Sequence, residues 1–141
     1  KAYLAKDDLN RAIADFDEAI RLNPQYSVAF LNRAFAYNRK GDRDRAIADY
    51  REAIRLDPKN AKAYNNRGVI YQTSGDMERA LADLNEALRV NPGYALALCN
   101  RGWVKLAIGD LTGRADIEKA KQLDPAQVER FCRSRPPAGP Q

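Results

Sequence analysis

The sequence contains no histidine, one tryptophan, one methionine and two cysteines among its 141 residues. Histidine is the commonest general base and the commonest metal ligand, so its absence disfavours hydrolytic chemistry and metal binding. Cys99 and Cys132 are too few for a disulfide framework or a zinc ligand set. No apolar run approaches the roughly 20 residues that a membrane-spanning helix needs. We therefore expect no catalytic residue, no metal, no cofactor and no membrane span in this sequence.

The charged residues are numerous but mixed in sign. Lysine and arginine number 24 and aspartate and glutamate 19, which gives a net charge of +5. Basic and acidic residues are interleaved along the chain, and no block of lysine and arginine stands out as a track for a phosphate backbone. This pattern disfavours nucleic acid as a partner.

A fixed period runs through the chain. Pro24, Pro58, Pro92 and Pro125 are spaced 34, 34 and 33 residues apart. When residues 27–60 are laid over residues 61–94, 14 of 34 positions are identical. Self-similarity at this spacing indicates a stacked repeat array, in which each repeat buries its apolar face mainly on its neighbours.

Each repeat is predicted to contain two helices. Gly41 and Gly75 follow stretches with helical periodicity, and Asp42 and Asp76 come next. Glycine accepts the left-handed turn that closes a helix, and aspartate caps the helix that follows. A second helical stretch then runs towards the next proline, which cannot continue a helix. The repeat is therefore helix, tight turn, helix and proline turn.

Small and bulky residues recur in phase on these helices. The small positions are Ala34, Gly68 and Gly102 in first helices and Ala46, Ala80, Ala53 and Ala87 in second helices. Aromatic residues such as Tyr37 and Tyr71 recur between them. This 34-residue pattern resembles the tetratricopeptide repeat, although arginine replaces the usual leucine at the seventh position, in the Asn-Arg-Gly variant similar to many bacterial members.

The resemblance implies an all-α fold, a right-handed superhelical solenoid of antiparallel helix pairs. We expect a tetratricopeptide array over residues 1–125, with a partial repeat at 1–26 and repeats at 27–60, 61–94 and 95–125. A capping helix at 126–135 and a proline-rich tail at 136–141 should follow. About a third of the first repeat is missing, so we expect a longer parent chain. Arg114 and Lys121 replace apolar residues of earlier repeats, which suits a stack that ends there.

Arginine and aspartate recur once per repeat. Arg33, Arg67 and Arg101 are in phase with Asp15, Asp49, Asp83 and Asp116. We predict a structural ladder of bidentate pairs, in which Arg67 contacts Asp49 or Asp83; the alternative is a row of arginines that faces acidic ligands. The pairs Glu18–Arg21, Arg45–Asp49, Glu52–Arg55 and Glu86–Arg89 have the spacing of solvated ion pairs on helices.

Successive residues of a helix are rotated by about 100° around its axis. Each first helix therefore has one stripe of residues that packs on its partner helix and a second stripe on the opposite side. In the tetratricopeptide family this stripe lines a concave groove that binds peptides. The resemblance therefore implies a peptide-binding surface with an apolar spine, flanking amides and nearby basic groups. Cys99 is expected here as a packed or groove-lining thiol rather than a nucleophile. The predicted peptide-binding residues are Leu31, Asn32, Phe35, Arg39, Lys62, Asn65, Asn66, Val69, Cys99, Asn100 and Trp103.

Three functions remain open at this point. The first is non-enzymatic protein–protein interaction, as a scaffold whose groove binds a peptide or helix. The second is a self-associating structural module whose groove holds its own tail or another copy. The third is a nucleic-acid-binding helical repeat. Some family members clamp acidic C-terminal tails, but Asn66 and Lys1 stand where that clamp would need arginine and asparagine, so such a tail is disfavoured.

Overall fold

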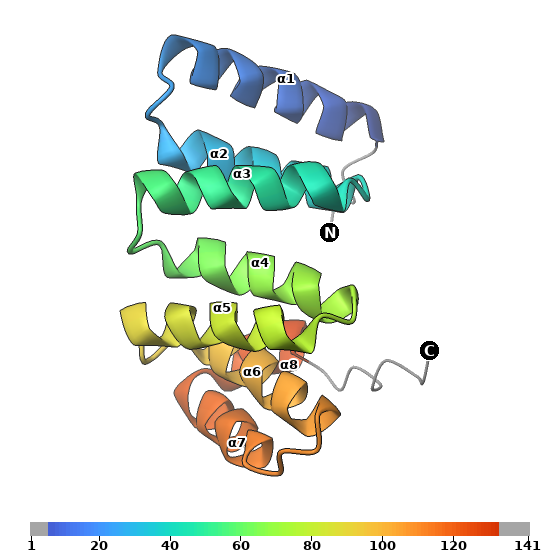
Figure 1. Ribbon diagram of the computed structural model, residues 1–141, viewed down its shortest axis with the longest axis vertical. Coiled ribbons are helices and arrows are strands. Elements are labelled where there is room, and N and C mark those ends of the chain that lie inside the picture. Colours follow the sequence, from blue (N-terminus) through green and yellow to red (C-terminus); the bar gives the residue numbers. More distant parts are fainter. Residues whose placement is uncertain (1–5, 133–141) are drawn as a thin grey trace. The chain divides into compact units, whose positions relative to one another are not determined.

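The computed structural model describes residues 6–132, and helices are the regular elements there. They confirm the expected all-α array of antiparallel helix pairs, joined by short turns (Figure 1). The eight helices of this range are α1 (Lys6–Leu22), α2 (Ser27–Arg39), α3 (Arg43–Leu56), α4 (Ala61–Thr73), α5 (Met77–Val90), α6 (Ala95–Ala107), α7 (Gly113–Leu123) and α8 (Pro125–Phe131).

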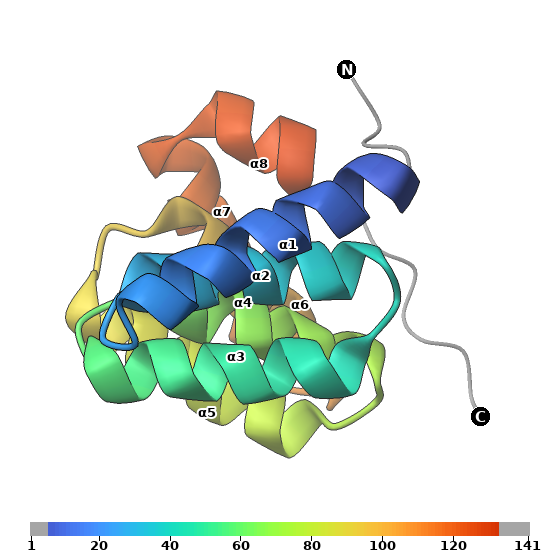
Figure 2. The same cartoon turned by 90° about the horizontal axis from the view of Figure 1, so that it is seen from above.

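The chain forms two compact units, which meet in sequence within α4, between Ala63 and Tyr64. In the first unit, α2 packs on both α1 and α3. Figure 2 shows α1 crossing over α2. Leu9 and Ile13 of α1 are buried with Ala36 of α2. On α3, Tyr50 is completely buried between alanines, because small residues let the helix backbones approach closely.

The second unit is centred on α6, which packs on α5, α7 and α8. Its apolar core includes Leu84 of α5, Leu98 and Val104 of α6, Ile117 of α7 and Val128 of α8. Figure 1 shows α8 as a short helix beside α6. α8 begins one residue before the expected capping helix at 126–135, and its capping role stays a prediction. Residues 133–135 of that predicted helix, and the predicted tail at 136–141, lie outside the described residues.

The turns within the repeats form as predicted from glycine and aspartate. Gly41 and Gly75 have φ values of 88° and 85°, in the left-handed region that side chains rarely enter. Asp42 then accepts a hydrogen bond from the backbone N–H of Arg45, and Asp76 accepts one from Arg79, both at 3.1 Å. The sequence Gly-Asp thus ends one helix and begins the next.

Glycine also sets the contact between α6 and α7. A Cβ atom on Gly102 would lie 2.6 Å from the carbonyl oxygen of Gly113 and 2.6 Å from Cγ1 of Ile117. Both distances are well below normal contact. The fourth repeat can bring these helices together only because neither glycine carries a side chain.

Candidate peptide-binding surfaces

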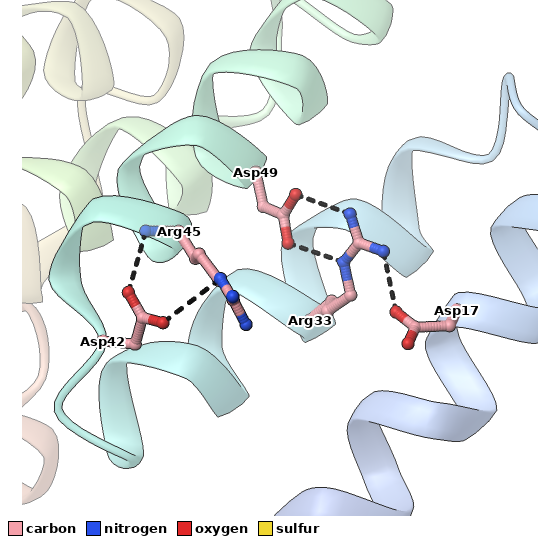
Figure 3. A network of polar contacts seen from close by, with 5 residues as sticks. All are labelled: Asp17, Arg33, Asp42, Arg45 and Asp49. Carbon is pink, nitrogen blue, oxygen red and sulfur yellow. Dashed lines mark hydrogen bonds and ion pairs between the residues drawn. The ribbon is translucent and has the colours of Figure 1, made fainter.

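The arginine of each repeat is held by the aspartate of the second helix in the same repeat. Arg33 of α2 donates from Nε and one Nη to the two carboxylate oxygens of Asp49 on α3, at 2.7 and 2.8 Å. Its other Nη donates to Asp17 of α1 at 2.8 Å. Figure 3 shows the guanidinium of Arg33 between the two carboxylates. The hydrogen bond with Asp49 raises the pKa of Arg33 further above its usual value, against the opposing effect of burial.

The same arrangement recurs in the second unit. Arg67 donates to both oxygens of Asp83 at 2.7 and 2.8 Å, and Arg101 donates to both oxygens of Asp116 at the same distances. The prediction of a structural arginine–aspartate ladder is therefore confirmed. These arginines are bound within the repeats, so they are not a free row of cations for acidic ligands.

Lys105 reinforces the last pair of this ladder. It replaces the tyrosine of earlier repeats, and its Nζ lies 3.2 Å from Asp116. Burial, the largest influence on Asp116, acts to raise its pKa. The hydrogen bonds from Arg101 and Lys105 lower the pKa, and their combined effect is larger than that of burial. The pKa of Asp116 therefore lies below its ordinary value of 3.8. This carboxylate is an ionised structural group and not a proton donor near neutral pH.

The predicted surface ion pairs are confirmed with one exception. Glu18–Arg21, Glu52–Arg55 and Glu86–Arg89 all form on exposed helix faces. The predicted pair Arg45–Asp49 is wrong, because Arg33 already binds both oxygens of Asp49. Arg45 lies near the N-cap residue Asp42 instead, at 3.4 Å (Figure 3).

In the first unit, α2 presents apolar side chains to solvent. Val28 is 45% exposed and Phe35 is 47% exposed, and Asn32 between them is also exposed. The guanidinium of Arg39 lies 5.9 Å from the centre of the Phe35 ring, a cation–π contact. Leu31 is buried behind this face. Lys62, at the start of α4, is exposed.

In the second unit, the predicted asparagines form a hydrogen-bonded network. Asn65 of α4 accepts a hydrogen bond from Asn100 of α6 at 3.0 Å and donates to Asn66 at 3.3 Å. Asn65 and Asn100 are buried, whereas Asn66 is half-buried. Burial raises the pKa of the nearby Tyr94, and a hydrogen bond with Asn65 opposes that shift. The buried side chains of Asn65 and Asn100 therefore bond to each other inside the protein, whereas the half-buried side chain of Asn66 remains partly accessible to solvent.

Val69 of α4 and Trp103 of α6 are half-buried. The indole Nε1 of Trp103 is buried and has no hydrogen-bond partner within the described residues. Trp103 lines a cleft of about 790 Å³ that lies between α6, α7 and α8. The cleft was not predicted, because it depends on how far the short helix α8 covers α6 and α7.

The two cysteines form a disulfide between α6 and the C-terminal end of α8. Cys99, predicted to be a packed or groove-lining thiol, is packed, but it is half of a disulfide and not a thiol. Cys99 is completely buried, and Cys132 is 6% exposed. Cys132 follows Cys99 by 33 residues, close to one repeat period, but it is the C-cap residue of the irregular helix α8, so the spacing alone did not bring the two side chains together.

Three tetratricopeptide family descriptions match the sequence: "TPR repeat" over residues 36–75, and "Tetratricopeptide repeat" over residues 61–94 and over residues 1–26. Two of these segments, residues 36–75 and 61–94, contain the helix pairs described above. The chain is a tetratricopeptide-repeat protein. No curated protein matches its sequence.

Solved structures resemble this tetratricopeptide chain closely in fold. A crystal structure of MamA has a TM-score of 0.77 and 20% identity, and the match covers 86% of this chain and 72% of that one. The first tetratricopeptide domain of Spaghetti (RPAP3), bound to the HSP90 peptide SRMEEVD, has a TM-score of 0.71 and 27% identity over 74% and 86% of the two chains. The second domain, bound to the same peptide, has a TM-score of 0.69 and 26% identity over 77% and 96%.

These findings support a protein–protein interaction module. Within residues 6–132, no three histidine, cysteine, aspartate or glutamate side chains gather as a metal site would require. None of the helices there is long and apolar enough to cross a membrane.

Proposed function

We propose that each unit of this tetratricopeptide protein binds peptide segments of partner proteins through the solvent-facing sides of its own helices, α2 in the first unit and α4 and α6 in the second. The observation that carries the proposal is the exposure of Phe35 and Val28 on one face of α2. Large apolar side chains that stay exposed beside polar groups commonly mark an interaction surface. An apolar peptide side chain can pack on Phe35, while Asn32 bonds the peptide backbone and Arg39 attracts its acidic groups.

Each unit contributes its own residues to the proposed recognition. In the first unit these are Asn32, Phe35, Arg39 and Lys62, which are exposed. In the second unit they are Asn66, Val69 and Trp103, which are half-buried. Leu31, Asn65, Cys99 and Asn100 lie behind these positions, where they hold the contacting side chains in place rather than touch the peptide.

Selection from a random peptide library displayed on phage gives a direct test of this proposal. Peptides that bind the wild-type protein should bind a Phe35→Ser variant at least about tenfold more weakly, because truncation of an aromatic hot-spot residue costs about 2 kcal/mol or more. Leu22→Ser is the matched control, since Leu22 is an exposed apolar residue on α1, 70% exposed. Equal loss in both variants, or no loss in either, would contradict the proposal.

The HSP90 peptide SRMEEVD serves as a probe of specificity. It is bound by the two Spaghetti (RPAP3) domains that resemble this chain. Here Lys62 and Asn32 suit an acidic clamp, but Asn66 offers an amide where the clamp would need a cation. We expect weak binding of this peptide to the wild-type protein and tighter binding to Asn66→Arg in calorimetry. Tight binding to the wild type would show that the partner class is broader than proposed.

A further inference from the structure

The helix α8 is joined to α6 by the Cys99–Cys132 disulfide, and it packs on α6 and α7. It has seven residues, too few for a stable helix in water on its own. Val128 is its buried residue, and Cys132 is the C-cap residue that carries the disulfide to Cys99. Phe131 is 54% exposed, so it adds little to the docking of α8.

The surface beneath α8 is suited to an amphipathic helix. The cleft of about 790 Å³ has an apolar floor made by Trp103 and Leu106 of α6 and Ile117 of α7. Arg114, Glu118 and Lys121 of α7 line the same cleft, so α7 offers two basic groups and one acidic group, a balance that favours a carboxylate on a docked helix. Trp103 adds a buried Nε1–H donor with no partner in the described residues, which an incoming acceptor could satisfy.

We propose that the cleft face of α6 and α7 is a docking site for a short amphipathic helix of a partner protein, and that the Cys99–Cys132 disulfide controls access to it. In the oxidised protein α8 covers part of this face and forms one wall of the cleft. Reduction leaves α8 attached by weak contacts alone, so a partner helix of the same chemistry can displace it. That helix carries an apolar residue at the place of Val128, a second apolar residue four positions later, and a carboxylate next to the first.

The redox step needs a dithiol as the reductant. One thiolate of the dithiol attacks a sulfur of the Cys99–Cys132 bond and forms a mixed disulfide, and its second thiolate resolves that bond. The Cys99–Cys132 disulfide gains two electrons and two protons from the dithiol and becomes two free thiols. The dithiol is oxidised to a disulfide. Because both cysteines are buried, the attack follows a transient opening of the end of α8.

A fluorescent peptide with the sequence of residues 124–132, in which serine replaces the final cysteine, is the probe. Its binding is followed by fluorescence anisotropy with the full chain. We expect no binding to the oxidised wild type and measurable binding after reduction with dithiothreitol. Reduced Val128→Asp protein should bind at least about tenfold more tightly than reduced wild type, because its own α8 competes poorly. The same peptide with an aspartate in place of its valine is the matched control and should not bind.

Hydrogen exchange of the full chain keeps the test decisive if a variant folds poorly. On reduction of the wild type, the amides of α8 should lose at least about tenfold in protection while those of α6 and α7 keep theirs. Unchanged protection of α8, or equal loss over the whole unit, overturns the proposal, because the disulfide then only stabilises the fold. Dimerisation of the reduced protein through exchanged α8 helices also overturns it, since the occupant is then a second copy. The probe does not touch α2, so its failure leaves the peptide-binding role of Phe35 unaffected.

Discussion

Arg67 and Asp83 meet through two parallel hydrogen bonds of 2.7 and 2.8 Å across one helix pair. Their side chains are only 18% and 8% exposed. A planar guanidinium matches a carboxylate in this forked geometry, and neither group could be buried alone without a large cost in solvation. The pair therefore explains why the repeats of this chain use arginine where related repeats use leucine.

Replacement of one partner of this pair and replacement of both partners should have different effects on stability. Asp83→Ala should lower the free energy of unfolding by about 2–4 kcal/mol, because it leaves Arg67 buried without its counter-charge. The double variant Arg67→Leu/Asp83→Leu should change it by less than about 1 kcal/mol, since apolar replacement of a whole buried pair is often tolerated. Glu86→Ala is the control from an exposed pair and should cost less than about 0.5 kcal/mol. Urea denaturation measures all three; equal effects of Asp83→Ala and Glu86→Ala would argue against a structural ladder.

Acid should weaken the second unit through Asp116. Its folded-state pKa lies below the ordinary 3.8, so its contribution to stability is present above pH of about 4 and is lost as the pH falls through the folded value. Asp116→Asn removes this titration. The stability difference between wild type and Asp116→Asn should therefore shrink steadily below about pH 4 in thermal melts. A constant difference from pH 7 to pH 2 would show that the charge of Asp116 does not stabilise the fold.

Gly102 should tolerate no side chain. Gly102→Ala places a methyl group against the carbonyl oxygen of Gly113, so α6 and α7 must move apart. We expect a loss of about 1–3 kcal/mol in the free energy of unfolding, as overpacked sites show. Gly93→Ala is the matched control, because the nearest atom to its added methyl group is 3.9 Å away. Chemical denaturation that gave equal losses for the two variants would exclude the close approach as the cause.

The repeat period and turn residues made the helix array predictable from sequence. Each Gly-Asp pair acts locally, so Gly41 and Asp42 determine a turn without knowledge of distant residues. The ladder was predictable for a related reason: Arg67 and Asp83 recur in phase, and a repeat array carries a contact from one repeat to the next.

The remaining features depend on packing that helix periodicity does not reveal. Asn65 and Asn100 share a stripe with exposed residues in a projection along the helix, but their mutual hydrogen bond draws both inside. The disulfide of Cys99 depends on the path of the chain after α7, where the regular period ends. The cleft beneath α8 depends on the same irregular segment, so composition and spacing could not show it.

Nuclear magnetic resonance mapping of a library-selected peptide tests the central claim most directly. The account predicts that the largest chemical-shift changes on titration fall on Asn32, Phe35 and Arg39 in the first unit. In the second unit they should fall on Asn66, Val69 and the indole N–H of Trp103. Glu52 on α3 and Glu86 on α5, which form surface ion pairs, should stay unchanged. Changes concentrated around Glu52 and Glu86, with Phe35 and Val69 unaffected, would contradict a peptide-binding role for α2, α4 and α6.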